Sequence, residues 1–309
     1  MTQIVERIGG GIYKTAKGVA NLAGLENKAW GRKTIAFLNM IGAKTFRLFV
    51  MNRRPFQING HLMYLGGKLA PSISFSADML AGKYEPEITV MMEQVLRPGM
   101  RVIDVGAHIG FHVLLAARLV GPTGQVYAFE PARDNFDVLQ RNIALNSYKN
   151  VTAVNKAVTD TSGTVTFHLS PEGNDRHSIR NSSRNAISHE SVTVGTVSID
   201  DFLESENWPA IDVIKMDAEG AEPNVFKGMR KLVLSATRLH MFIEFAPSCL
   251  EESGFDPREF LSEIMSSGFE IRLLGGAQNE SLEPLRPEDF SRFIEEAKQE
   301  GMKNLFCSK

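Results

Sequence analysis

The sequence predicts an α/β fold built on a parallel sheet. Between residues 101 and 154, and again between 211 and 274, short apolar runs alternate with longer segments of helical periodicity. Such alternation is typical of consecutive βαβ units. A glycine turn follows the first apolar run, at the kind of strand end where open parallel sheets bind ligands. The chain has 309 residues, 43% of them hydrophobic, which is enough for one large domain and an appendage.

The individual elements follow from these patterns in chain order. Strands are expected at 101–105, 125–129, 151–154, 211–216, 240–245 and 269–274. Helices are expected between them at 109–120, 132–145, 224–235 and 257–267, and the tail adds a helix at 288–298 and a strand at 304–307. The segment 159–197, rich in Ser, Asn and Arg, interrupts the alternation and is predicted to hold two further strands, 164–169 and 192–197.

The N-terminal part of the chain differs from the rest in charge. Residues 1–54 carry ten Lys or Arg and two Glu, whereas the whole chain has a formal charge of −2. Residues 34–51 have the pattern of a basic amphipathic helix, and Asn59-Gly60 indicates a hairpin after it. We expect a helical and hairpin extension over 1–78 and a main domain over 79–309.

This basic segment has two interpretations. It docks on the main domain or on a second subunit with its charges in water, or it lies on an anionic membrane surface as a peripheral contact. Nucleic acid is not an expected partner, because the excess charge lacks interleaved aromatic residues and the remainder of the chain is acidic. The sequence leaves the oligomeric state open.

Composition narrows the class of protein further. The two cysteines and the absence of Cys/His spacing typical of zinc sites indicate neither a disulfide framework nor structural zinc. Apolar runs are too short for a membrane span, and the first residues lack the apolar core of a signal peptide. A cytoplasmic protein, with a possible peripheral position at the inner face of the membrane, is the expectation.

The turn after the first strand carries the most specific signal. It reads Val105-Gly106-Ala107-His108-Ile109-Gly110. A dinucleotide fingerprint would have a glycine at position 108, so that the backbone can approach a pyrophosphate. His108 therefore disfavours a nicotinamide cofactor and favours S-adenosylmethionine, which has no phosphate.

The next two strands end in residues that could hold a nucleoside. Glu130 lies 24 residues beyond Gly106 and can accept hydrogen bonds from both ribose hydroxyls. The alternative is a simple strand terminus before Pro131. After the third strand, Asn155-Lys156-Ala157 is placed to meet an adenine edge, although an ordinary loop would have similar residues.

Four sequence blocks, in order, resemble the FkbM family of methyltransferases. They are Gly82–Pro86, Pro98–Ala107, Phe129–Pro131 and Ile214–Glu222. The resemblance covers roughly residues 80–275, and it departs from the family at His108, where Asn is more usual. It implies a Rossmann-like class I methyltransferase sheet with helices on both faces, S-adenosylmethionine as donor and a hydroxyl as acceptor. The expected cofactor-binding residues are Tyr84, Glu85, Asp104, Gly106, Ala107, His108, Gly110, Glu130, Pro131, Lys156, Ala157 and Asp217.

The acceptor side is expected at the carboxyl ends of the later strands. Asp217 and Glu219 follow the strand 211–216, and Glu244 ends the strand 240–245. A carboxylate there can act as the general base that an aliphatic hydroxyl needs. Acids before a helix also stabilise its N-terminus. Glu222, which precedes Pro223, fits that structural role better than a catalytic one. These acids could bind a divalent ion, but their spacing selects no metal.

Histidines are the remaining candidates. His177 and His189 lie in the polar interruption, where a loop could fold over the cofactor and supply a base. A lone histidine in a polar loop is more often solvated. Of the two we expect His177 to join Asp217, Glu219 and Glu244 as a catalytic residue. His108 and His112 are equally compatible with a contact to the cofactor and with packing beneath it.

The leading hypothesis is an O-methyltransferase that acts on a hydroxyl of a carbohydrate, glycolipid or secondary metabolite. The acceptor would be a small molecule, a sugar or a lipid-linked compound. A nicotinamide-dependent oxidoreductase and a non-catalytic module that binds a membrane or a partner are the competing hypotheses. The sequence does not distinguish among acceptors.

Overall fold

The computed structural model describes residues 54–66, 73–169, 191–275 and 283–309. By its internal contacts the chain divides into residues 1–55 and residues 56–309, and the description below concerns the second unit. The predicted helix 34–51 and residues His177 and His189 lie outside the described residues. None of the described helices combines the length and the apolar character that crossing a membrane requires.

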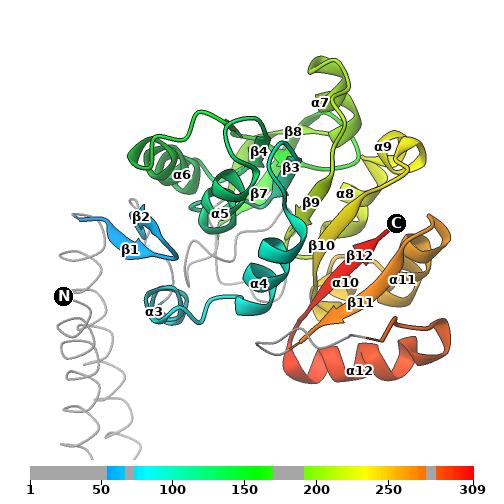
Figure 1. The fold of residues 1–309 in the computed structure, drawn as a ribbon. Coiled ribbons are helices and arrows are strands. Elements are labelled where there is room, and N and C mark those ends of the chain that lie inside the picture. The colour runs from blue at the N-terminus through cyan, green and yellow to red at the C-terminus, as the bar shows by residue number, and fades with distance from the viewer. Residues whose placement is uncertain (1–53, 67–72, 170–190, 276–282) are drawn as a thin grey trace, which may run out of the picture. The chain divides into compact units, whose positions relative to one another are not determined.

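In the described part of the chain, seven strands form one central sheet (Figure 1). Five of them are parallel neighbours. In spatial order they are β5 (Val151–Val154), β4 (Gln125–Phe129), β3 (Arg101–Val105), β9 (Val213–Met216) and β10 (His240–Phe245). The next strand, β12 (Lys303–Ser308), is antiparallel both to β10 and to the edge strand β11 (Glu270–Leu274). The predicted parallel sheet is thus confirmed for the first five strands, and the tail strand reverses direction.

Alternate side chains of these strands enter two separate apolar cores. Val102 and Val126 pack into one core, and Ile103 and Tyr127, the next residue of each strand, pack into the other. Successive side chains of a strand point to opposite faces, so a sheet with both faces covered requires nearly continuous apolar strands. This explains why the strands read as uninterrupted apolar runs in the sequence.

Helices cover both faces of the sheet, as predicted. The helices α4 (Pro86–Val95), α5 (Phe111–Val120) and α6 (Arg133–Leu145) contribute to the core around Val102. The opposite core receives side chains of α7 (Ile199–Ser205), α8 (Glu222–Lys227), α9 (Arg230–Ser235), α10 (Pro247–Glu252), α11 (Pro257–Ser266) and α12 (Phe290–Glu300), which the 3₁₀ turn η2 (Pro287–Asp289) precedes. The Rossmann-like α/β fold is therefore confirmed.

The predicted helix over 224–235 is two helices, α8 and α9. The break lies at Gly228, where an added Cβ would come within 2.1 Å of the Thr159 carbonyl oxygen. The Asp200 carboxylate accepts hydrogen bonds from the backbone N–H groups of Lys231 and Leu232 and so caps α9. Because these contacts join residues far apart in the chain, helical periodicity alone does not reveal them.

A small second sheet interrupts the alternation, as the sequence predicts. It consists of β6 (Ala157–Val158), β8 (Ser191–Val197) and β7 (Gly163–His168), in that spatial order. The strand β8 pairs parallel with β6 and antiparallel with β7. Only two residues separate the end of β5 from the start of β6, so the small sheet begins beside the carboxyl end of the central sheet.

The predicted hairpin forms between β1 (Phe56–Ile58) and β2 (His61–Met63) and packs on α6. The Asn142 side chain exchanges hydrogen bonds with the Tyr64 backbone, and the Asn146 side chain does the same with Leu62. Asp78, near which we predicted a domain boundary, lies inside the helix α3 (Ile73–Ala81). The hairpin and α3 thus fall in the unit that contains the sheet.

Candidate functional site

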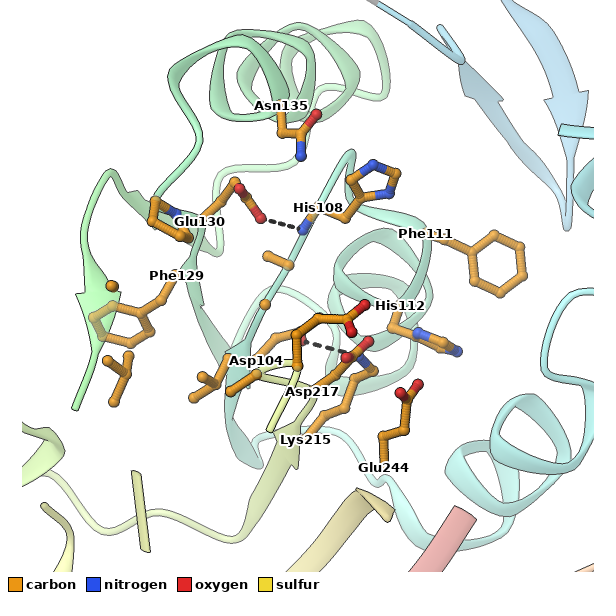
Figure 2. A pocket seen from close by; sticks show the side chains of 18 of the residues that line it. Asp104, His108, Phe111, His112, Phe129, Glu130, Asn135, Lys215, Asp217 and Glu244 are labelled. Carbon is orange, nitrogen blue, oxygen red and sulfur yellow. Dashed lines mark hydrogen bonds and ion pairs between the residues drawn. The ribbon is translucent and has the colours of Figure 1, made fainter. Parts of the chain in front are cut away.

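A cavity of about 270 Å³ lies at the carboxyl ends of β3, β4, β9 and β10 (Figure 2). This volume is close to the lower end of the range that is common for ligand pockets, ~300 Å³. The residues predicted for the site that line this cavity are Tyr84, Glu85, Asp104, Gly106, Ala107, His108, Glu130, Pro131, Lys156, Ala157, Asp217, Glu219 and Glu244. Of the remaining predicted residues, Gly110 does not line it, and His177 lies outside the described residues.

Gly106 lets the loops after β3 and β9 touch. It has a φ of 78°, and an added Cβ would lie 1.9 Å from the Asp217 carbonyl oxygen. The Asp217 N–H donates to the Val105 carbonyl at 3.1 Å. A side chain at position 106 would therefore separate the two loops that carry the predicted donor and acceptor residues.

His108 occupies a left-handed position in the same loop, with a φ of 49°. Histidine and asparagine tolerate this conformation better than most residues, which accounts physically for the residue types found at this point of the turn. The His108 N–H donates to Glu130 Oε2 at 2.9 Å (Figure 2). The turn after β3 is thereby fixed to the end of β4.

Glu130 is buried, and both of its oxygens accept backbone hydrogen bonds. Oε1 receives the Ala132 N–H at 2.8 Å, and the Asn135 side chain also bonds to the carboxyl group. Burial raises the pKa of Glu130 to about 7 despite these donors, which lower it. Each carboxylate oxygen can accept more than one hydrogen bond, so Glu130 retains capacity toward the cavity.

Gly110, which we predicted as a cofactor-binding residue, makes a packing contact between two helices. It lies before α5 with a φ of 95°, and an added Cβ would come within 2.6 Å of the Leu139 side chain on α6. A residue without a side chain lets α5 begin close to α6. Gly110 thus shapes the turn without lining the cavity.

Lys215 is a buried cation beneath the cavity. Its Nζ lies 3.2 Å from Asp217 Oδ2 and 4.0 Å from Asp104 Oδ1, and 5% of its side chain is exposed. Asp104 and Lys215 are also register partners on the neighbouring strands β3 and β9. Burial lowers the pKa of Lys215, but Asp217 and Asp104 outweigh it and raise the pKa above its usual value. Burial raises the pKa of Asp104 to about 6, although Lys215 opposes this shift.

Carboxyl groups outnumber cations around this lysine. Burial raises the pKa of Glu85 to about 8, with Lys215 lowering it and Asp217 raising it. Burial also holds the pKa of Glu244 well above its usual value, and the nearby acids Asp217 and Glu219 add to the effect. The free pocket is therefore an environment that favours an added positive charge.

Aromatic rings form one wall of the cavity. The Phe75 ring lies 4.8 Å from the rings of both Tyr84 and His108, and Tyr84 lies 5.2 Å from Phe111, all in edge-to-face contacts. Burial and the neighbouring Glu85 raise the pKa of Tyr84 well above 10.0, so its phenol stays protonated. This wall shields the acids from water.

Two predicted alternatives turn out to be structural. Glu222 Oε1 accepts hydrogen bonds from the backbone N–H groups of Ala218 and Gly220 at the start of α8, which is the helix-start role that we favoured. The Asn155 side chain donates to the carbonyls of Glu130 and Pro131. Lys156 and Ala157, beside it, line the cavity.

Sequence reasoning missed Lys215, Asn135 and the aromatic residues Phe75 and Phe111. Lys215 had a visible signal, because it is a lysine within an otherwise apolar buried strand. Asn135 had no signal, since nothing in the helix 133–145 distinguishes the asparagine that reaches Glu130 from those that hold the hairpin.

The methyltransferase FkbM domain family matches residues 104–272, which is more than half of the chain. The chain belongs to the FkbM methyltransferase family. This confirms the predicted family and, with it, a methyltransferase that uses S-adenosylmethionine as cofactor.

Individual relatives match over part of the chain. The hexuronic acid methyltransferase AglP of Haloferax volcanii is 30% identical over 157 residues, 50% of this chain and 57% of AglP. Methyltransferase sdnD of Sordaria araneosa is 28% identical over 190 residues, 50% of this chain and 73% of sdnD. A protein-L-isoaspartate O-methyltransferase of Methanothrix thermoacetophila is 37% identical over 71 residues, 22% of this chain and 34% of that relative. The chain thus spans little more than half of AglP and a third of the last relative.

Solved structures with similar coordinates include an O-methyltransferase from Bacillus cereus in complex with SAH. It has a TM-score of 0.42 and 13% identity, and the match covers 72% of this chain and 79% of that one. Precorrin-6y C5,15-methyltransferase from Geobacter metallireducens has a TM-score of 0.41 and 12% identity, with 78% and 93% covered.

Replacing Gly106 with alanine should prevent the two loops from meeting. We expect Gly106→Ala to lower the thermal unfolding midpoint and to weaken binding of S-adenosylhomocysteine, because the Asp217 carbonyl must move. Gly268→Ala is the matched control: Gly268 also has a positive φ, 92°, but no atom lies within 4 Å of its added Cβ. The control should cost only about 1–2 kcal/mol of left-handed strain. Equal effects of both substitutions would contradict the close approach.

The ligand-free protein should lose stability as pH rises from 6.5 to 8.5. The folded-state pKa values of Glu130 and Glu85 are raised to about 7 and about 8. The folded protein therefore holds protons that the unfolded chain has already released, and this stabilisation is lost as pH rises through those values. We expect the unfolding midpoint to fall by at least about 2 °C. Glu85→Gln should flatten the dependence, and an unchanged slope in that variant would exclude Glu85 as its source.

Proposed function

We propose that the protein is an O-methyltransferase that methylates a hydroxyl group of a carbohydrate, glycolipid or secondary metabolite. The observation that carries this proposal is the convergence of Asp217, Glu219 and Glu244 on the same cavity as Gly106 and Glu130. Acids that can take up a proton thus lie beside the loop expected to hold the methyl donor.

Within this proposal, the tips of β3 and β4 hold the donor. S-adenosylmethionine supplies an electrophilic methyl group on a positively charged sulfur. Glu130 accepts hydrogen bonds from the ribose hydroxyls, and Pro131, Lys156 and Ala157 flank the adenine. The backbone of Gly106, Ala107 and His108 lies against the centre of the molecule, with Asp104 and Tyr84 toward its methionine end.

The charge of the cavity supports this placement. Among the described residues, Asp104, Glu85, Asp217 and Glu244 lie around the ammonium group of Lys215, and Lys156 is the other lysine that lines the cavity. In a buried site such an excess of carboxylates favours a cationic ligand. A sulfonium centre would meet this requirement, whereas the pyrophosphate of a nicotinamide cofactor would add to the negative charge.

The acids also suit the acceptor chemistry. An aliphatic hydroxyl must lose its proton as it attacks, and a base is most effective when its pKa approaches the working pH. Burial, with the neighbouring acids Asp217 and Glu219, raises the pKa of Glu244 above its usual value, which makes its carboxylate a stronger base than an exposed one. We propose Glu244 as the base, with Asp217 and Glu219 orienting the hydroxyl.

A carboxyl group is the second candidate acceptor. Hexuronic acid, which names the relative AglP, offers both hydroxyl and carboxylate oxygens. The carboxylates around Lys215 would repel an anionic acceptor at this end of the cavity. The charge of the pocket therefore favours a hydroxyl as the reacting group.

Glu130→Gln should weaken donor binding. Loss of charged hydrogen bonds to the ribose would raise the dissociation constant of S-adenosylhomocysteine about tenfold or more. Calorimetric titration measures this value, with Glu93→Gln as a control because Glu93 is an exposed residue of α4. Parallel titration with NAD separates the competing cofactors. Tight NAD binding without S-adenosylhomocysteine binding would overturn the proposal.

Glu244→Gln, Asp217→Asn and Glu219→Gln should reduce turnover more than donor affinity. Removal of a general base typically costs about 10²–10⁴-fold in rate, and we expect the largest loss for Glu244→Gln. A screen of hydroxyl and carboxyl acceptors with labelled donor, read by mass spectrometry, identifies the reaction to measure. Glu204→Gln, at an exposed site on α7, serves as control. Unchanged turnover in all three pocket variants would remove these acids from the mechanism.

A further inference from the structure

We propose that Glu85, Asp217 and Glu244 form a binding site for a divalent metal ion at the acceptor side of the cavity. The catalytic use of this ion rests on the proposed function, but its binding does not. The site would take a cation that prefers oxygen ligands, with Mn²⁺ as the probe.

The three carboxylates come from separate parts of the fold and converge. Glu85 is the residue before α4, Asp217 follows β9, and Glu244 lies near the end of β10. One oxygen of each lies within 4.8 Å of the others. Ligand oxygens bind such ions at about 2.0–2.6 Å, so oxygens on opposite sides of one ion are ~4–5 Å apart. The observed spacing fits a shared ion without rearrangement of the backbone.

Unsatisfied polar atoms beside the acids give independent support. His112 has 4% of its side chain exposed, and its Nε2 lies 3.5 Å from Glu85 Oε2. Both atoms are buried and have no hydrogen-bond partner, although nearly all buried polar groups in proteins are paired. Their separation exceeds the usual N–H···O range. A cation bound by Glu85 would satisfy its carboxylate oxygen, whereas His112 is not among the described residues whose ligand atoms lie within 4.8 Å of one another.

Lys215 does not meet this need. Its ammonium group pairs with Asp217 and Asp104 from beneath the cavity. Among the described residues, no Lys or Arg lies within ion-pair distance of Glu85 or Glu244. Asp217 Oδ2 faces Lys215, which leaves its other oxygen for an ion. The lysine thus offsets negative charge on the strand side of the cluster, and an ion would offset the negative charge that faces the cavity.

A bound ion would also position the acceptor. Its remaining coordination positions would face the cavity between Asp217 and the donor loop at Gly106, where a hydroxyl oxygen can bind. Coordination lowers the pKa of a bound hydroxyl, so with Glu244 as a ligand, the ion itself would ease the loss of the hydroxyl proton.

The test is titration of Mn²⁺ into the metal-free full-length chain. Binding is monitored through the electron paramagnetic resonance signal of free Mn²⁺. We expect one saturable site in the wild type. Glu85→Gln and Glu244→Gln should each raise its dissociation constant at least about tenfold, since even indirect contacts to a metal are worth that much. Glu93 is an exposed residue of α4, the helix that follows Glu85. Glu93→Gln should therefore leave the dissociation constant of Mn²⁺ unchanged.

Repeating the titration with saturating S-adenosylhomocysteine separates the ion from the donor. Undiminished Mn²⁺ binding supports the site, whereas displacement of Mn²⁺ would assign the acids to the donor and overturn the proposal. Wild-type affinity in either glutamine variant would overturn it as well. Circular dichroism checks each variant, and if Glu85→Gln does not fold, Glu244→Gln decides the question alone.

The metal site and the proposed function can fail separately. If the chain binds no Mn²⁺ and methyl transfer persists in the presence of a chelator, then the metal site is contradicted and the proposed function is supported. If the chain binds Mn²⁺ saturably, Glu244→Gln abolishes that binding, and no acceptor is methylated, then the metal site is supported and the proposed function is contradicted.

Discussion

The buried ammonium group of Lys215 lies between Asp104 and Asp217, and the arrangement of the acids around the cavity depends on it. The three residues belong to neighbouring strand ends, and Asp104 and Lys215 are paired in register. An unpaired lysine at this depth would be costly, and so would the two aspartates without it. Lys215 also lowers the pKa values of Asp104 and Glu85, which burial raises. One strand residue thus permits several carboxyl groups to share a small cavity.

Backbone geometry imposes a second constraint on the same strand ends. Glu85, His108 and Glu219 line the cavity in left-handed conformations, with φ values of 40°, 49° and 51°. Such conformations are uncommon outside glycine and cluster at functional sites, where the surrounding structure holds them in place. The loops of His108 and Glu219 begin directly at the buried strands β3 and β9, so the sheet supports them, whereas Glu85 is the residue before the helix α4. The side chains are consequently oriented before any ligand binds.

The sequence predicts those parts of the molecule that depend on local patterns. Strand positions follow from apolar runs, and the acids at the ends of β9 and β10 follow from their place after those runs. The division of the predicted helix 224–235 was not predicted: Gly228 packs against the Thr159 carbonyl and Asp200 caps α9, and both residues are distant in sequence. The same holds for Asn142, which joins the hairpin to α6. Side-chain contacts between distant segments decide these features, and periodicity carries no record of them.

Part of the cavity wall comes from outside the region that matches the family. Phe75 and Met79 lie on α3, and Met302 precedes β12, whereas the family match spans residues 104–272. Of the residues that we propose for the donor, Gly106 and Glu130 lie within the matched region, whereas Tyr84 lies outside it. The aromatic contacts of Phe75 with Tyr84 and His108 join α3 to the loop after β3, so a substitution in α3 would change the shape of the cavity beside that loop.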